Sequence, residues 1–121
     1  ELRRKMKPEE QSRQLAENMK KWIEEKNGTD IKVLDIHGVS SLGDYFVIAS
    51  GSSDRQVGAI ADNIQDKASE MGIEPKNVEG LRTGRWILLD YYDVIAHIFH
   101  EDDRAYYNLE RLWKDSTEVE L

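Results

Sequence analysis

Two strand-forming runs with a very short connection constrain the fold of this chain more than any other feature. Residues 85–90 and 93–99 are rich in branched and aromatic residues, and only Tyr91 and Tyr92 lie between them. A two-residue connection of this kind joins neighbouring antiparallel strands. The sequence therefore predicts a β-hairpin whose side chains alternate between two faces.

The two faces of this predicted hairpin differ in composition. One face is small and aliphatic, which suits packing beneath helices. The other face mixes an aromatic ring, an imidazole, aliphatic groups and two carboxylates. If Tyr91 and Tyr92 form the loop, the cross-strand pairs on the second face are Trp86 with His97, Leu88 with Ile95 and Asp90 with Asp93.

The mixed face has two interpretations. An open sheet surface with an aromatic anchor, apolar neighbours and an acidic edge has the composition of a protein-binding patch. Alternatively, Trp86 packs beneath the N-terminal helix as ordinary core, with its indole N–H bonded to a local acceptor. The expected pairing of Asp90 with Asp93 favours the first interpretation, because a positively charged partner would relieve the repulsion between them.

The remaining residues alternate between helical and strand patterns. Pro8 can occupy the first turn of an N-terminal helix, and Asn27-Gly28 can end it. The apolar residues between them keep helical spacing: Leu15, Met19, Trp22 and Ile23. Strands are expected at residues 31–36, 44–50, 77–80, 85–90 and 93–99, and further helices at residues 53–71 and from Glu101 onward.

This order predicts an α/β fold, a single domain with a mixed five-stranded sheet and helices packed against it. The strand at 44–50 is apolar almost throughout and is expected at the centre of the sheet. A length of 121 residues suits one domain. We expect an N-terminal helical segment at 1–28, an α/β body at 29–115 and a loose tail at 116–121.

Composition excludes several classes of protein. The chain has no cysteine, so disulfides and thiolate chemistry are excluded. Its apolar runs fall short of the roughly 20 residues of a membrane span, and we expect a cytoplasmic protein without membrane contact. Residues 1–26 have a net charge of +2, whereas the rest has nine basic and 18 acidic residues. A body with a net charge of −9 is repelled by phosphate backbones, so we expect no direct nucleic-acid binding by it.

A phosphate site is the main alternative on the enzyme side. Gly51-Ser52-Ser53 lies between a predicted strand and the start of a helix, where backbone N–H groups can hold phosphate. The lysine and further glycines of a P-loop are missing, and so are the paired carboxylates of a nucleotidyltransferase. Because Gln56 follows Ser53 by three residues, a turn with a helix cap is the favoured interpretation.

Metal binding and catalysis are not expected either. His97 and His100 lie three residues apart on a strand, so they point to opposite faces and would not share one ion. We expect His97 to be a surface partner of Trp86. Since no nucleophile, base and electrophile come together, we expect no enzyme activity, cofactor or metal.

Six separated segments of the chain resemble the ribosomal silencing factor family, also called Iojap or RsfS. The resemblance runs from about Ile31 to Trp113, in the order and spacing of the family. The segments are DYFVI at 44–48, GSSDRQ at 51–56, VEG at 78–80, RWILLD at 85–90, DVIAH at 93–97 and YYNLERLW at 106–113.

The resemblance implies a fold akin to nucleotidyltransferases but without their catalytic carboxylates. It also implies a translation repressor that binds the large ribosomal subunit through a basic ribosomal protein, large-subunit protein fourteen, at the intersubunit face. Such a factor would sterically block joining of the small subunit. Family members are often homodimers when free, and a homodimer is expected here.

The strand tryptophan of the family belongs to its contact surface, and this role transfers to Trp86. We expect Leu88 and Ile95 beside it as apolar contacts, and His97 as its neighbour. Lys or Arg residues of the partner would meet three carboxylates, and Tyr91 would pack at the rim. These carboxylates are Glu79, Asp90 and Asp93. One departure is Tyr92, because the family commonly has glycine there and a turn that needs positive φ would be strained by tyrosine.

Overall fold

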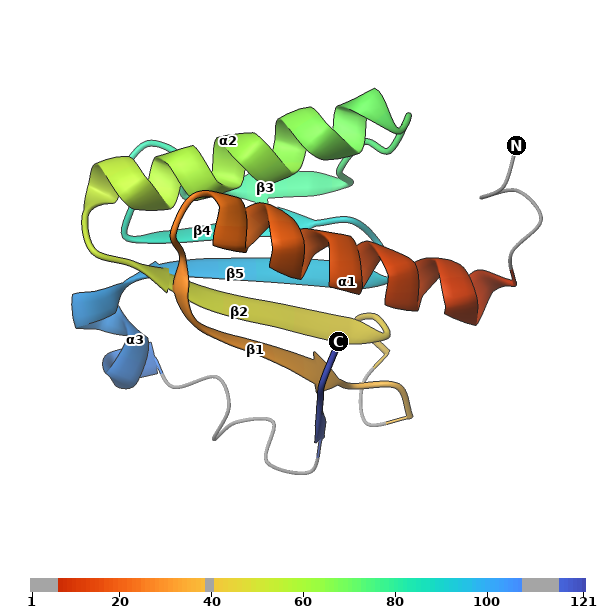
Figure 1. Cartoon of the computed structure of the whole chain (residues 1–121). Coiled ribbons are helices and arrows are strands. Elements are labelled where there is room, and N and C mark those ends of the chain that lie inside the picture. The colour runs from red at the N-terminus through yellow and green to blue at the C-terminus, as the bar shows by residue number, and fades with distance from the viewer. Residues whose placement is uncertain (1–6, 39–40, 108–115) are drawn as a thin grey trace.

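The computed structural model describes residues 7–38, 41–107 and 116–121. The helices and strands in this part of the chain are shown in Figure 1. In chain order they are α1 (Pro8–Glu25), β1 (Thr29–Asp35), β2 (Tyr45–Gly51), α2 (Asp54–Glu70), β3 (Asn77–Glu79), β4 (Trp86–Asp90), β5 (Val94–His100), α3 (Glu101–Tyr107) and β6 (Thr117–Val119).

The strands form one mixed sheet in the order β3-β4-β5-β2-β1-β6. Only the central pair, β2 and β5, is parallel among the described strand pairs. The predicted α/β class and the central position of the apolar strand are confirmed. The prediction of five strands is corrected to six, because Thr117–Val119 pairs with β1 where a loose tail was expected.

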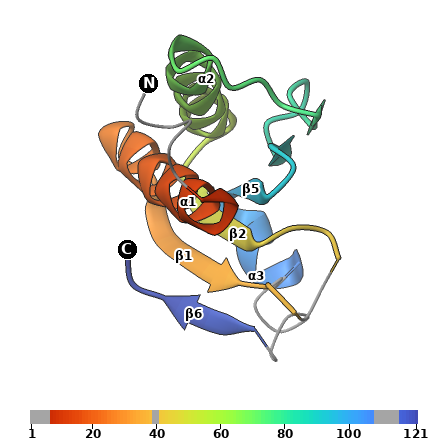
Figure 2. The ribbon, with the colours of Figure 1, turned by 90° about the vertical axis from the view of Figure 1, so that its right-hand side faces the viewer.

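Helices α1 and α2 cover one face of the sheet (Figures 1 and 2). The apolar stripe predicted for α1 is confirmed, since Leu15, Met19, Trp22 and Ile23 are all buried there. The helix ends at Glu25, and the residue with positive φ behind it is Asn27 at 62°, not Gly28. Gly28 is needed for a different reason. A Cβ atom at this position would clash with Cγ2 of Ile23.

The opposite face of the sheet carries a second apolar cluster. Helix α3 lies on this side (Figure 2) and contacts β5 and β2. Trp86 and Leu88 are half-buried and pack against the buried members of the cluster. These buried members are Leu34, Ile36, Phe46, Ile48, Ile95 and Phe99. The centre of this face is therefore buried, and the expectation of an open face holds only for its β3–β4 side. Residues 108–115, which the sequence assigns to the last helix, lie outside the described residues.

The hairpin of β4 and β5 is present, but its register differs by two residues from the prediction. Asp90 lies opposite Ile95, Leu88 opposite His97 and Trp86 opposite Phe99. The N–H of Tyr91 donates to the carbonyl of Val94 at 2.9 Å, so Tyr92 and Asp93 form the loop. A shift of two residues keeps the side chains of residues 85–90 and 94–99 on their predicted faces, and only Asp93 leaves the strand for the loop.

Candidate partner-binding face

Four of the predicted contact residues lie together on the β3–β4 side of the sheet. Trp86, Leu88 and Asp90 alternate along β4, and Glu79 of β3 lies opposite Leu88. All four belong to the face that is opposite α1 and α2. We call these four residues the β3–β4 face. The structure therefore brings half of the predicted site together on one edge of the molecule.

The indole of Trp86 is held from two directions. Its Nε1–H donates a hydrogen bond to Nδ1 of His97 at 3.2 Å. Its ring also stacks on Phe99, with 4.9 Å between centroids and an interplanar angle of 25°. Trp86 is half-buried rather than sealed beneath α1 or α2. An aromatic side chain that is fixed in this way and still partly accessible suits a role as an interface anchor.

His97 is the partner of Trp86, as predicted, but it is not a surface residue. Only 5% of it is exposed, and burial lowers its pKa from 6.5 to about 4. Because Nδ1 accepts the indole hydrogen bond, the proton of the neutral ring lies on Nε2. That atom is buried and has no hydrogen-bond partner. The imidazole also makes an edge-to-face contact with the ring of Phe46, with 4.8 Å between the ring centroids.

Two predicted apolar contacts are buried. Ile95 is 6% exposed and belongs to the second cluster beneath the β3–β4 face. Tyr91 is 4% exposed and packs into the core on the side of α1 and α2. The prediction that Tyr91 lies at the rim of the face is therefore wrong. The cause is the one-residue shift of the hairpin loop, which makes Tyr91 a strand residue paired with Val94 rather than a loop residue.

The expected repulsion between Asp90 and Asp93 is absent. Oδ1 of Asp90 accepts a hydrogen bond from the N–H of Tyr92 at 2.8 Å, and Asp93 lies in the loop. Burial, followed by the charge of Asp44, raises the pKa of Asp93. The charge argument for an open face is thus removed, and Asp93 belongs to another part of the surface.

The Gly51-Ser52-Ser53 turn is closed by the side chain of Gln56. Oγ of Ser53 accepts from the N–H of Gln56 at 3.0 Å, as the predicted helix cap requires. Oε1 of Gln56 accepts from both the N–H and the hydroxyl of Ser52. The amide of Gln56 donates to the carbonyls of Lys26 and Asn27. Since these groups already have partners, the turn is a structural cap rather than an open phosphate cradle.

Sequence reasoning missed the aromatic layer beneath Trp86. Phe46 and Phe99 come from β2 and β5, two strands that are far apart in the chain and adjacent in the sheet. Alternation along residues 44–50 places Phe46 and Ile48 on one face of their strand, and this is the sequence pattern that points to part of the layer. The parallel pairing of β2 with β5, which no local pattern specifies, was needed to join them.

The described residues show neither a metal site nor a membrane span. No three His, Asp or Glu side chains in this part of the chain are grouped so that they could hold a metal ion. None of its helices is long and apolar enough to cross a membrane.

Comparison with protein families gives a match to the ribosomal silencing factor during starvation, RsfS, over residues 9–121. The chain belongs to the ribosomal silencing factor family. It is 49% identical over 98 residues to the ribosomal silencing factor RsfS of Bacillus subtilis, covering 81% of this chain and 83% of that protein. It is 31% identical over 107 residues to the chloroplastic protein Iojap of Zea mays, covering 88% of this chain and 46% of that protein.

Solved structures of similar proteins share the fold. A crystal structure of a protein from Chromobacterium violaceum matches with a TM-score of 0.82 and 34% identity, covering 84% of this chain and 85% of that one. A crystal structure of a Bacillus halodurans protein matches with a TM-score of 0.76 and 44% identity, covering 89% of this chain and 95% of that one. The predicted membership in the RsfS and Iojap family is confirmed.

Proposed function

We propose that this protein represses translation in the cytoplasm by binding the large ribosomal subunit and blocking the small subunit from joining. Its contact would be a basic ribosomal protein, large-subunit protein fourteen. Membership in a family named for ribosomal silencing supports the process. The single structural observation that supports the contact is the β3–β4 face, where half-buried Trp86 and Leu88 share one surface with the carboxylates of Glu79 and Asp90.

The composition of this face matches the proposed partner. Trp86 offers a large amphipathic ring whose position is already fixed by His97 and Phe99. Little rotational freedom is therefore lost when a partner covers it. Glu79 is exposed and Asp90 is half-buried, and residues 27–121 have a net charge of −9. A negative surface of this kind speeds association with a positive one.

We further propose that the protein acts without catalysis and that its free form is a homodimer. The family names describe regulators, and Gln56 already fills the turn that a nucleotide-binding enzyme would use. The β3–β4 face would serve either partner, so dimer and ribosome would compete for it. Size-exclusion chromatography of the free protein checks the homodimer.

The decisive variant is Trp86→Ala. We expect it to weaken binding to purified large subunits by about 30-fold, which corresponds to about 2 kcal/mol for a buried aromatic anchor. Leu42→Ala is the matched control, because Leu42 is 58% exposed and lies on the β1–β2 connection. Co-sedimentation measures affinity, and a sucrose-gradient assay of subunit joining measures repression. Unchanged affinity of a folded Trp86→Ala variant would contradict the proposed contact.

Glu79→Lys tests the same face without disturbing buried groups, because Glu79 is exposed. We expect slower association with the large subunit and a flatter dependence of its rate on salt. Glu70→Lys on α2 changes the net charge equally at an exposed position on the other side of the sheet. Equal salt slopes for the two variants would count against an electrostatic role of the β3–β4 face.

A further inference from the structure

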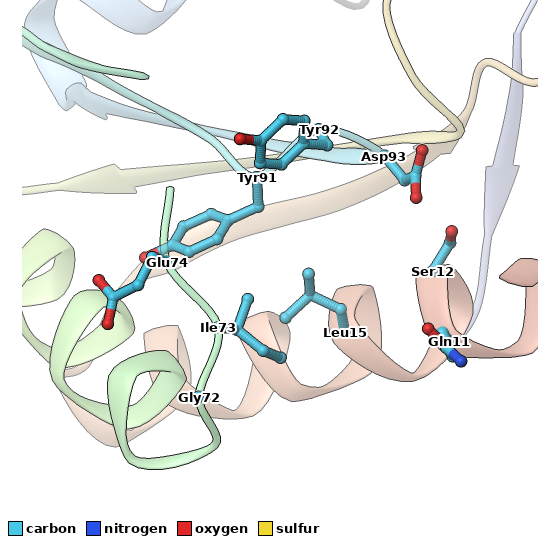
Figure 3. Close-up of a pocket in the computed structure, with 9 residues that line it drawn as sticks. All are labelled: Gln11, Ser12, Leu15, Gly72, Ile73, Glu74, Tyr91, Tyr92 and Asp93. Atoms are coloured by element: carbon cyan, nitrogen blue, oxygen red, sulfur yellow. The ribbon is translucent and has the colours of Figure 1, made fainter. Parts of the chain in front are cut away.

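Two buried side-chain polar atoms in the described part of the chain have no hydrogen-bond partner. They are Oη of Tyr91 and Nε2 of His97. The ring of Tyr91 belongs to the main core on the side of α1 and α2, and Figure 3 shows its hydroxyl pointing towards Glu74. Packing of this large ring accounts for Tyr91. His97 is different, because its ring has a second nitrogen that makes a directional contact.

The position of His97 would suit an aliphatic side chain. The ring centroids of Phe46 and Phe99 lie 4.8 and 6.5 Å from that of the imidazole, and only 5% of His97 is exposed. A buried N–H without an acceptor costs free energy. An aliphatic residue of similar size would avoid this cost. What it could not replace is Nδ1, the nitrogen that has a partner.

Nδ1 of His97 determines how the indole of Trp86 is turned. It accepts the hydrogen bond from Nε1–H at 3.2 Å. Because burial lowers the pKa of His97 to about 4, the imidazole is neutral at neutral pH and Nδ1 keeps its lone pair. The stacking of Trp86 on Phe99 is less specific, since stacked rings can slide or turn in their planes. The directional hydrogen bond therefore sets which edge of the indole faces into the molecule.

A partner that covers Trp86 would not reach His97. Trp86 is half-buried, whereas His97 presents almost no surface. The indole N–H is the only hydrogen-bond donor of the Trp86 side chain, and His97 already accepts from it. A partner would therefore meet the ring carbons and π electrons of Trp86, which attract the cationic side chains of a basic protein.

We propose that His97 is a positioning residue for Trp86 and increases affinity for the large ribosomal subunit without touching it. This role rests on the proposed function, in which Trp86 is the anchor of the β3–β4 face. Without an acceptor at Nδ1, the indole N–H would turn towards water, since such a group takes a partner wherever one is in reach. Binding would then have to restore the orientation of the ring, at a cost in conformational entropy.

Two substitutions of His97 separate its acceptor from its packing. His97→Leu is close in size and has no acceptor, whereas Oδ1 in His97→Asn lies where Nδ1 was. Ile48→Val is the matched control, because Ile48 is fully buried opposite His97, so the change loosens the same layer and keeps the acceptor. We expect His97→Leu to bind purified large subunits about 5-fold more weakly. His97→Asn and Ile48→Val should bind like the unchanged protein.

A double-mutant cycle with Trp86→Phe shows whether His97 acts through the indole. Trp86→Phe keeps an aromatic ring and removes the N–H. In this background His97→Leu should weaken binding no further, because the hydrogen bond is already absent. A merely structural role of His97 would give the same loss of affinity in both backgrounds.

NMR of the free full chain labelled with ¹⁵N measures the position of the ring without ribosomes. The indole N–H signal of Trp86 is the one that disappears in Trp86→Phe. We expect His97→Leu to shift this signal and to speed its exchange with water about 5-fold, as loss of one hydrogen bond implies. His97→Asn should restore slow exchange.

Three results would overturn this role of His97. They are an unchanged indole signal in His97→Leu, full affinity of His97→Leu while Trp86→Ala binds weakly, and equal losses in the two backgrounds of the cycle. Failure of the proposed function looks different, because Trp86→Ala then binds like the unchanged protein. The gain in affinity assigned to His97 would fall with it, and the indole signal would still show whether His97 holds Trp86 in place.

Discussion

Tyr92 adopts a backbone conformation that glycine adopts far more easily. Its φ is 72°, and the N–H of Asp93 donates to the carbonyl of Tyr91 across it, as in a γ-turn with positive φ. Its side chain is 60% exposed and contributes little to the core. A side chain in this region of backbone space costs of order 1–3 kcal/mol.

Tyr92→Gly should therefore stabilise the protein by about 1 kcal/mol, since relief of strain exceeds the extra freedom that glycine gives the unfolded chain. Tyr92→Ala is the matched control, because it removes the ring and keeps the Cβ atom that causes the strain. We expect Tyr92→Ala to bring no gain. Urea unfolding midpoints of the two variants measure the difference, and equal midpoints would show that the backbone is not strained.

Individual residues also show which parts of the site could be predicted from the sequence. The pairing of Trp86 with His97 as neighbours was predictable, because both residues alternate onto one face of a hairpin. The burial of His97 and Tyr91 was not. The burial of His97 depends on Phe46, which belongs to another strand. The burial of Tyr91 depends on the position of the hairpin loop, in which Tyr92 adopts a positive φ that tyrosine disfavours.

At the scale of elements, α2 and the connection behind α1 are tied together by one side chain. Gln56 accepts from Ser52 and donates to the carbonyls of Lys26 and Asn27 at 3.1 and 2.9 Å. The start of α2 is therefore fixed to the end of α1 as well as capped by Ser53. These contacts position the two helices that cover the sheet.

Gln56→Ala should lower the free energy of unfolding by about 2 kcal/mol, because several backbone groups lose their partner at once. Gln65→Ala is the control on the same helix, since Gln65 has no hydrogen bond to another element among the described residues. We expect the control to change stability by less than about 0.5 kcal/mol. Thermal and urea unfolding give both values, and similar losses would contradict the bridging role.

Element prediction failed where a segment was short or its partner distant. Strand β6 has three residues, Thr117–Val119, which is too short for alternation to be recognised. The sequence pattern also fixed both faces of the hairpin but left its register open, because a shift of two residues preserves the faces. Longer elements such as α1 and α2 have clear helical periods, α2 also has the predicted cap at Ser53, and both helices are confirmed.

For the whole molecule, a buried neutral histidine makes stability depend on pH. The pKa of His97 is lowered from 6.5 to about 4 by burial. Between these values the unfolded chain takes up a proton that the folded protein does not. The free energy of unfolding should therefore fall as the pH drops from 6.5 towards 4, by up to about 3 kcal/mol from this residue. Above pH 6.5 the ring of His97 is neutral in both the folded and the unfolded state, so it no longer changes the free energy of unfolding with pH.

Urea unfolding at pH 7 and pH 4.5 checks this dependence. The loss on acidification should be smaller in His97→Gln, which cannot take up the proton, whatever its stability at pH 7. His37→Gln is the matched control, because the His37 side chain is 78% exposed, and it should retain the full loss. A His97→Gln protein that loses as much as the control would rule out His97 as the cause.

The parallel pair at the centre of the sheet has a consequence for how the chain is made. β2 cannot meet β5 until α2, β3 and β4 have all been synthesised, because these elements lie between them in sequence. Contacts of such long range form slowly. A nascent chain that ends before Val94 therefore exposes the apolar edge of β2 to solvent, and the core can close only after β5 has been made.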